Sequence, residues 1–342
     1  MPRGARFTRS GTSAPVIDTE LKVGIVGAGG VAQRHAGALA AMPDVTLLGV
    51  IDLDRGRAAD LAATVGTTPV DDVDALLERG VDAVWVCVPP FAHGEVEERL
   101  ARGGVALFVE KPLGLDVAAA EQVHAAVVAA GVPTSVGHHW RSSTAVARAR
   151  ELLGGRTVRL VSATWLDKVP PVPWWAQRGS SGGQVVEQAV HALDLARMLA
   201  GEVTAVHAVA DAAPPAPGTD VDSATAGTLS FACGAVGTLA ATCRLSWKHR
   251  AGIELYADDL ALSLSEEQLT VRDGDGTWSV EVDPTNARTA ADRAFVDHLL
   301  GRAPSGPGTV VDYGEALRTH RLACALADSV ASGAPVALDG AR

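Results

Sequence analysis

Residues 21–42, "LKVGIVGAGGVAQRHAGALAAM", contain the pattern that is most informative about the fold of this chain. It begins as a mostly apolar strand, turns at a cluster of glycines and continues with apolar residues at helical spacing. Gly27-x-Gly29-x-x-Ala32 therefore stands between a predicted strand and a predicted helix, the context in which this motif binds a dinucleotide. Gly27 permits the tight turn, Gly29 lets the backbone approach a pyrophosphate, and Ala32 lets the helix pack on the strand.

Asp52 ends the second predicted strand of this region. A carboxylate at this place can accept hydrogen bonds from both ribose hydroxyls of an adenosine and repels a 2′-phosphate, which favours NAD over NADP. Arg55 and Arg57 lie close by and could bind a phosphate, so NADP is not excluded. The alternative interpretation is an ordinary strand-to-helix turn in which Asp52 is the N-cap of the next helix.

The pattern outside this turn predicts two domains. Strands alternate with helices up to about residue 140, which is typical of a parallel sheet built from βαβ units. After about residue 155 the strands alternate apolar and polar residues and are joined by short turns, and only 184–200 and the tail from 287 have the pattern of long helices. The predicted fold class is α/β, with an N-terminal Rossmann doubly wound parallel sheet and a C-terminal α+β domain whose open sheet is mostly antiparallel.

The predicted boundaries follow from the same pattern and from the length of 342 residues, which exceeds what one core usually spans. Residues 1–20 contain arginines but no apolar core, and we expect them to form a disordered lead-in. The predicted Rossmann domain then spans residues 21–140, and the predicted substrate and oligomerisation domain spans residues 141–342.

Composition limits the possible partners. The formal net charge of −11 argues against a nucleic-acid partner and against adsorption to an anionic membrane. No apolar run reaches the roughly 18–20 residues that a membrane span needs. The four cysteines form no CxxC pair and no metal-ligand spacing, so we predict reduced thiols, no metal and a cytoplasmic location.

Two further strands carry polar residues to the edge of the predicted parallel sheet. One ends at Pro89-Pro90, with His93 at the start of the next helix; the other, "VALFVEKP", ends at Glu110 and Lys111. Ligands of open α/β sheets bind beyond the carboxyl ends of the strands, so these residues are candidates for cofactor contacts. The alternatives are a water-exposed His93 and a strand-end charge pair that reaches solvent.

The stretch "GGQVVEQAVHALDL" at residues 182–195 is the most polar part of a predicted apolar helix. Glu187, His191 and Asp194 are spaced i, i+4 and i+7, so a continuous helix would carry them on one side. A solvated helix face would usually carry several charged residues, whereas residues 182–196 contain no Lys or Arg. The competing interpretation is a buried helix whose polar groups bind one another.

The order of these motifs resembles the Gfo/Idh/MocA oxidoreductase family: the glycine turn, "VPP…H", "EKP", and a helix led by two glycines with an acid four residues before a histidine. The resemblance covers nearly all of the chain after residue 20. It implies nicotinamide-dependent oxidation of a sugar or polyol hydroxyl, or the reverse reduction, and a homodimer or homotetramer formed through the C-terminal sheet. By family position Lys111 is the active-site lysine and His191 the catalytic histidine. The family often has Asp where this chain has Glu187.

These motifs and the resemblance together define the expected site. The expected catalytic residues are Lys111, His191 and Glu187. The expected cofactor is NAD, with NADP not excluded, and its expected contacts are Gly27, Gly29, Gly30, Val31, Asp52, Pro89, His93, Glu110 and Lys111. Trp174 lies in a Pro- and Trp-rich loop, where it could stack on a sugar ring or clamp the loop. The expected substrate contacts are His138, Arg141, Trp174 and Asp194.

Two other functions would use the same dinucleotide-binding fold. A glycosidase of the same fold would oxidise and re-reduce its sugar with a bound NAD and release no net NADH. A non-catalytic regulator would bind the dinucleotide alone, but the presence of both Lys111 and His191 argues against it.

Overall fold

The computed structural model describes residues 20–211 and 213–338, so the predicted lead-in lies outside the described residues apart from Glu20. The described chain forms two compact units. The first comprises residues 20–114, 118–139 and 288–315, and the second comprises residues 115–117, 140–287 and 316–338.

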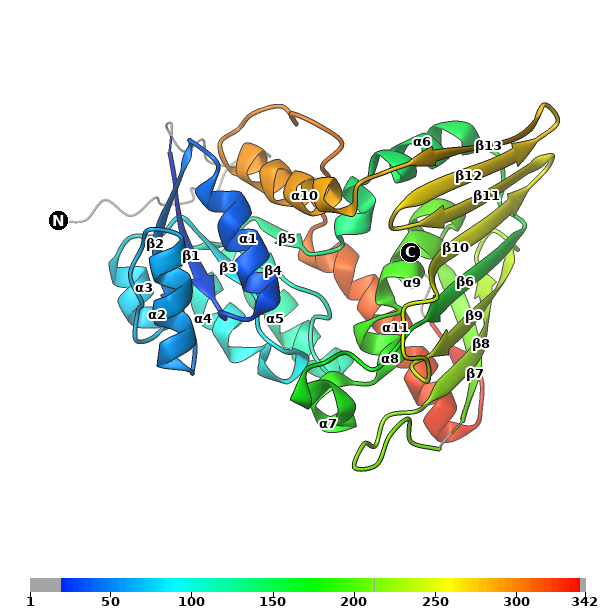
Figure 1. Cartoon of the computed structure of the whole chain (residues 1–342), viewed down its shortest axis with the longest axis horizontal. Coiled ribbons are helices and arrows are strands. Elements are labelled where there is room, and N and C mark those ends of the chain that lie inside the picture. Colours follow the sequence, from blue (N-terminus) through cyan, green and yellow to red (C-terminus); the bar gives the residue numbers. More distant parts are fainter. Residues whose placement is uncertain (1–19, 212, 339–342) are drawn as a thin grey trace. The chain divides into compact units, whose positions relative to one another are not determined.

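The first unit is built on a five-stranded parallel sheet with the strand order β2-β1-β3-β4-β5 (Figure 1). Its strands are β1 (Leu21–Val26), β2 (Val45–Ile51), β3 (Ala83–Val86), β4 (Ala106–Val109) and β5 (Thr134–Val136). Its connecting helices are α1 (Gly30–Ala40), α2 (Arg55–Thr64), α3 (Val73–Glu78), the 3-10 turn η1 (Pro90–Ala92), α4 (Glu95–Arg102) and α5 (Val117–Ala130). The predicted parallel Rossmann sheet is confirmed. The strand order reverses between β1 and β3, and this is where such sheets bind their ligands.

One segment of the first unit comes from late in the sequence. Helix α10 (Pro284–Leu299) lies beside α1, and its Phe295 packs against the rings of Trp85 and Phe108 at 5.6 and 6.0 Å (Figure 1). We expected these residues in the second domain, but residues 288–315 belong to the first compact unit. Helical periodicity shows that a helix has an apolar face, and it does not show which sheet that face will cover.

The second unit is built on a nine-stranded sheet with the order β13-β12-β11-β10-β6-β9-β8-β7-β14. Neighbouring strands are antiparallel except for β6 and β9, which run parallel. The strands are β6 (Leu160–Leu166), β7 (Val203–Asp211), β8 (Ala224–Phe231), β9 (Val236–Thr242), β10 (Arg250–Ala257), β11 (Leu260–Ser265), β12 (Gln268–Asp273), β13 (Gly276–Glu281) and β14 (Val336–Ala337). The predicted mostly antiparallel sheet is confirmed.

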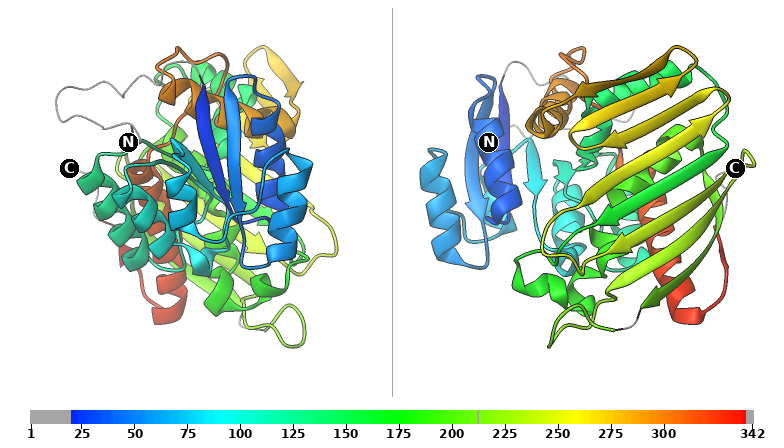
Figure 2. Two further views of the ribbon diagram at one scale, coloured as in Figure 1. Left: turned by 90° about the vertical axis from the view of Figure 1, so that its left-hand side faces the viewer. Right: turned by 45° about the vertical axis from the view of Figure 1, so that its right-hand side comes forward.

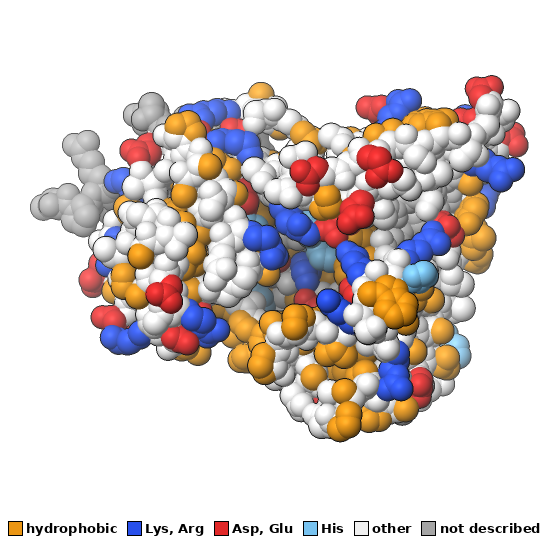
Figure 3. All heavy atoms as spheres, in the orientation of Figure 1, with side chains coloured by type: hydrophobic (Ala, Val, Ile, Leu, Met, Phe, Trp, Pro, Cys, Tyr) orange, Lys and Arg blue, Asp and Glu red, His pale blue; other side chains and the backbone are white. Residues whose placement is uncertain are grey.

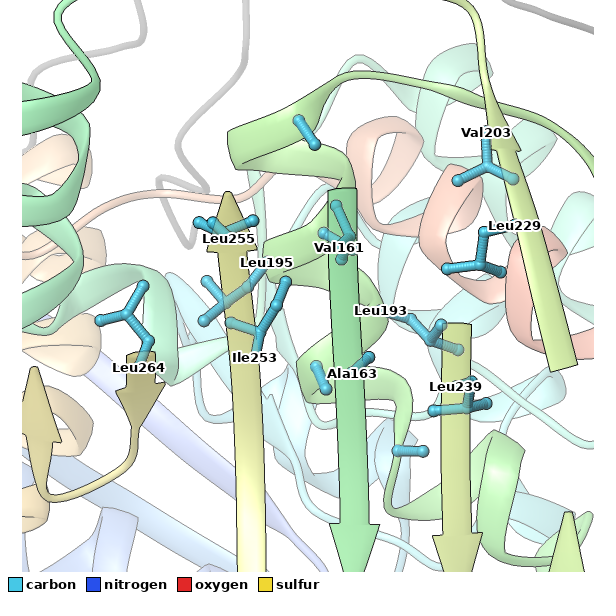
Figure 4. Close-up of a cluster of buried hydrophobic side chains, with 14 of the residues drawn as sticks. Val161, Ala163, Leu193, Leu195, Val203, Leu229, Leu239, Ile253, Leu255 and Leu264 are labelled. Carbon is cyan, nitrogen blue, oxygen red and sulfur yellow. The ribbon is translucent and has the colours of Figure 1, made fainter. Parts of the chain in front are cut away.

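Helices cover one face of this sheet. Figure 2 (right) shows the strands in front with α9 and α11 behind them, and Figure 4 shows Leu193 and Leu195 of α9 among side chains of the strands. Exposed and buried residues alternate along β8 and β9, so the exposed ones lie on the opposite face, as in a sheet with one solvated side. The helices of this part of the chain are η2 (His139–Ser142), α6 (Thr144–Leu153), η3 (Pro173–Ala176), α7 (Arg178–Ser181), α8 (Gln184–Glu187), α9 (Val190–Ala200) and α11 (Tyr313–Ser332).

The first unit carries charges of both signs on its surface. On the face drawn in Figure 3, basic and acidic side chains are interspersed over the first unit. Among the helices within residues 20–211 and 213–338, none is both long enough and apolar enough to cross a membrane.

Candidate active site

The turn after β1 requires glycine at position 27. Gly27 has φ +94°, a conformation that other residues rarely adopt, and a Cβ placed there would lie 2.3 Å from the carbonyl oxygen of Cys87. The Gly27 N–H donates to the carbonyl of Ile51 at 2.7 Å. The turn is therefore packed tightly between the ends of β2 and β3.

The next two glycines leave space above the start of α1. A Cβ at Gly29 or Gly30 would meet nothing within 4 Å. Gly29 is the N-cap, no side chain caps the helix, and its first turn, which includes Val31, has no acidic residue. Uncapped N–H groups at the positive end of an 11-residue helix suit a phosphate. These residues fit the pyrophosphate of a dinucleotide.

Asp52 connects the end of β2 to this turn. Its carboxylate accepts the N–H groups of Ala28 at 2.7 Å and Asp54 at 2.8 Å, and the guanidinium of Arg57 at 3.1 Å. The N-cap of α2 is Asp54, so the alternative interpretation of Asp52 as an N-cap is wrong. Arg55, the other candidate for a phosphate contact, forms an exposed ion pair with Asp71.

His93 is held inside the first unit. Pro89 ends the extended stretch after β3, and the His93 side chain that follows is 1% exposed, with its Nδ1 2.5 Å from a carboxylate oxygen of Glu97. Glu97 also accepts the Gly94 N–H at 2.8 Å. The alternative of a water-exposed His93 is therefore wrong, and a direct cofactor contact by this ring stays a prediction.

The carboxyl end of β4 carries a buried ion. Glu110 is 9% exposed, and its carboxylate accepts a hydrogen bond from His35 Nε2 at 3.0 Å. A Cβ at position 137 would lie 2.3 Å from a Glu110 oxygen, so the carboxylate packs on the bare backbone of Gly137. The alternative of a charge pair reaching solvent is wrong for Glu110. Lys111 follows it directly, and the Lys111–Pro112 peptide bond is cis.

The charges around Glu110 keep it ionised. Burial raises the pKa of the Glu110 carboxyl, but the hydrogen bond and charge of His35, with the charges of Lys111 and His139, outweigh burial and hold that pKa below its usual value. Burial lowers the pKa of His35, yet the charges and hydrogen bonds of Asp292 and Glu110 outweigh it and raise the pKa to about 10. Lys111 is thus next to an ionised carboxylate.

His35 and Asp292 are residues that sequence analysis missed. The local signal is that His35 is a polar residue on the buried face of α1, next to Ala32, Ala36 and Leu39. Asp292 lies 257 residues further along the chain, and no local pattern connects the two.

In the second unit, His191 lies among aromatic rings. Its imidazole is 5.5 Å from the ring of Trp140 and 5.8 Å from that of Trp165, nearly parallel to both. The ammonium group of Lys248 lies over the Trp165 ring, 5.4 Å from the ring centre. Such contacts fix the plane of the imidazole, because a ring packed on two indoles cannot rotate without losing contact area.

The predicted continuous helix around His191 is interrupted. Helix α8 ends at Glu187 and α9 begins at Val190, and the N–H of Ala189 bonds to the carbonyl of Gln184, five residues back. A bond of this type widens the turn and changes the direction in which later side chains point. The prediction that one continuous helix carries Glu187, His191 and Asp194 on the same side is therefore wrong. His191 and Asp194 both lie on α9, whereas Glu187 ends α8.

Glu187 binds the loop that precedes it. Its carboxylate accepts the indole N–H of Trp175 at 2.7 Å, and Trp175 is fully buried. Trp174 is partly buried and packs against a small cluster of Trp175, Val221 and Cys243. These contacts hold the Trp-rich loop in place, which is the clamping function that one of the two interpretations of Trp174 predicted.

Arg141 and Asp194, two of the expected substrate contacts, bind each other. Two guanidinium nitrogens lie 2.7 and 2.6 Å from the two carboxylate oxygens, and the side chains are 9% and 1% exposed. Thr319 of α11 also donates to Asp194 at 2.9 Å. His138 belongs to the first unit, where it follows β5 and is buried.

Comparison with known proteins identifies the architecture. Residues 21–138 match the oxidoreductase family with an NAD-binding Rossmann fold, and residues 148–262 match the C-terminal domain of the GFO/IDH/MocA proteins. Together the two matches cover more than half of the chain. The chain belongs to the Gfo/Idh/MocA oxidoreductase family. Its glycine turn is accordingly that of an NAD-binding domain.

Similar members of the Gfo/Idh/MocA family include dehydrogenases. Inositol 2-dehydrogenase of Rhizobium meliloti (strain 1021) is 29% identical, over 75% of this chain and 80% of that protein. scyllo-Inositol 2-dehydrogenase (NAD(+)) of Bacillus subtilis (strain 168) is 25% identical, over 95% and 98%. The structure of levoglucosan dehydrogenase with NADH superposes with a TM-score of 0.85 at 21% identity, over 94% and 100%, which shows a shared fold.

Substitutions of Gly27 and Gly29 in this turn should have different effects, the first on stability and the second on cofactor binding. We expect Gly27→Ala to lower the free energy of unfolding by about 2 kcal/mol or more, because alanine must adopt positive φ and clashes with Cys87. Gly29→Ala should leave stability nearly unchanged and weaken NADH binding, because its methyl group enters the space above α1. Urea unfolding and NADH fluorescence titration measure the two effects, and equal unfolding midpoints for both variants would contradict this explanation.

Proposed function

We propose that this chain is an NAD-dependent dehydrogenase that oxidises a secondary hydroxyl of a cyclic polyol or sugar, or reduces the matching ketone. The supporting observation is the position of Lys111, which lies two residues beyond the end of the buried strand β4, at the carboxyl edge of the NAD-binding sheet. The inositol dehydrogenases among its relatives act on cyclic polyols, and levoglucosan dehydrogenase has been captured with NADH and levoglucosan.

In this proposal His191 and Lys111 act on the substrate hydroxyl. His191 accepts the hydroxyl proton, since imidazole exchanges protons near neutral pH, and its two indole neighbours hold the ring in one plane. The Lys111 ammonium donates a hydrogen bond to the same oxygen and stabilises negative charge as it develops. NAD, when bound, supplies the acceptor for the hydride.

The remaining site residues act by binding or positioning. Glu187 holds Trp175 and so fixes the loop before His191, which gives a function to the glutamate that replaces the family's usual aspartate. The Arg141–Asp194 pair supports α9 rather than contacting substrate, because both ions are occupied by each other. His138 and Trp174 remain the proposed substrate contacts.

Asp52 should determine the choice between NAD and NADP. We expect Asp52→Ala to weaken NAD binding by about tenfold or more, because a hydrogen bond to a charged group contributes roughly 1.5–3 kcal/mol. Binding of NADP should improve relative to NAD, because the repulsion between the Asp52 carboxylate and a 2′-phosphate is removed and Arg57 keeps only its weaker pair with Asp54. Calorimetry with both cofactors measures the ratio, with Arg55→Ala as the control. An unchanged NAD-to-NADP ratio would remove Asp52 from the cofactor site.

The function is tested by adding NAD to the protein with a panel of inositols, sugars and anhydrosugars. Growth of NADH absorbance with one of them, absent in Lys111→Ala, supports the proposal. Release of free sugar from a glycoside without net NADH would instead identify the glycosidase, and NAD binding without turnover of any compound would favour the regulator.

The homodimer or homotetramer expected from the resemblance stays a prediction. The solvated face of the nine-stranded sheet exposes Leu160, Val209 and Val236 by 41%, 60% and 57%. Apolar side chains on a flat sheet face are typical of a surface that pairs. Light scattering coupled to size-exclusion chromatography measures the mass directly.

A further inference from the structure

A buried ionic cluster lies beside the proposed catalytic lysine. His35 of α1 stands between Asp292 of α10, 2.6 Å from its Nδ1, and Glu110 at the end of β4, 3.0 Å from its Nε2. The three residues are 7%, 1% and 9% exposed. Trp85 of β3 also donates its indole N–H to the same Asp292 oxygen at 2.8 Å.

The geometry favours a charged His35. A neutral imidazole has one N–H and one bare nitrogen, so it can donate to only one of two carboxylates. Here both ring nitrogens face carboxylate oxygens, and an imidazolium is the form that donates to both. A buried ion requires partners of opposite charge, and the cluster supplies them.

We propose that His35 is a permanently charged positioning residue that keeps Glu110 ionised and in place, and thereby orients the adjacent Lys111 for the reaction. This inference rests on the proposed role of Lys111. Glu110 cannot move towards Gly137, because its carboxylate already fills the space that a side chain there would occupy. The Glu110 carboxylate is hydrogen-bonded to His35, which is itself anchored to Asp292 and packed 5.1 Å from the Phe108 ring.

The other charges around the cluster do not replace His35. Lys111 and His139 act on Glu110 through their charge, whereas His35 acts through both charge and a hydrogen bond. Burial is the first cause that raises the pKa of the Cys87 thiol, and the nearby Glu110 and Asp292 raise it further, so this thiol stays neutral. The charged groups that act on His35 are therefore Asp292 and Glu110. Lys111 and His139 act on Glu110, and Arg34 acts on Cys87.

Two substitutions of His35 separate its two contacts. Asn places its amide near the Nδ1 position and can keep the Asp292 contact, whereas Gln reaches the Nε2 position and can keep the Glu110 contact. We expect His35→Asn to reduce turnover roughly tenfold to a hundredfold, since small misplacements of a reacting group have effects of this size, with KM changed less than twofold. His35→Gln should retain more turnover than His35→Asn.

The charge is measured separately from turnover. In the wild-type protein, nitrogen NMR should show both His35 nitrogens protonated at neutral pH. In His35→Asn, infrared difference spectra between neutral and mildly acidic buffer should show a newly protonated carboxyl that is absent from His35→Asn/Glu110→Gln, because burial raises the Glu110 pKa and only the weaker effects of the Lys111 and His139 charges then oppose it. The wild-type NMR measurement remains valid even if a His35 variant does not fold.

The outcomes distinguish this inference from the proposed function. A neutral His35 in the wild-type protein, or a new carboxyl signal with unchanged turnover, would overturn the positioning role. Equal losses in His35→Asn and His35→Gln that match their losses of thermal stability would show a purely structural role and also overturn it. If instead Lys111→Ala keeps full activity, the proposed function fails, whatever the NMR result for His35.

Discussion

Lys111→Ala and His191→Ala should each lose most turnover while still binding NADH. For His191 we expect a loss of about 100- to 10,000-fold in kcat, the usual effect of removing a general base. For Lys111 we expect about 100- to 1,000-fold, the usual effect of removing one donor to a developing oxyanion. Steady-state rates with the active compound of the polyol panel measure both effects, and NADH fluorescence measures cofactor affinity.

The matched control for His191 is His191→Asn, which keeps a polar group beside Trp140 and Trp165 but cannot accept a proton as imidazole does. It should be as inactive as His191→Ala and more stable. Full activity in either alanine variant would remove that residue from the mechanism. A loss of NADH binding equal to the loss of turnover would instead assign the residue to the cofactor site.

Asp194→Ala should cause the largest loss of stability among the charged residues discussed. It leaves the Arg141 guanidinium buried without its bidentate partner and removes the acceptor of the Thr319 hydroxyl. Breaking a buried ion pair by removing one partner typically costs about 3–5 kcal/mol. Urea unfolding measures this change.

The double variant Arg141→Met/Asp194→Leu is the control for that experiment. It removes both charges, so it should be more stable than Asp194→Ala, as expected when the cost comes from an unpaired buried ion. A double variant less stable than either single variant would show that the pair itself, rather than the avoidance of an unpaired charge, stabilises α9.

Some features of the site could be predicted from the sequence. Gly27, Asp52 and Lys111 each stand at a strand end that is visible from the alternation of apolar strands and helices, and their carboxyl edge follows from the parallel sheet. The prediction from helical spacing failed at residue 188. One hydrogen bond to the residue five positions back rotates all later side chains about the helix axis, and no residue type in the sequence signals such a bond.

The Rossmann turn, the two kinds of sheet and the strand ends that carry the polar residues are predictable from residue order alone, because they depend on local periodicity and on the conformations open to glycine. The pairing of the buried ions is visible only in the folded chain. Glu110 and His35 are 75 residues apart, and Arg141 and Asp194 are 53 apart. A buried charge needs a partner of opposite sign, and the packing of α1, α9 and α10 on their sheets selects that partner from distant parts of the chain.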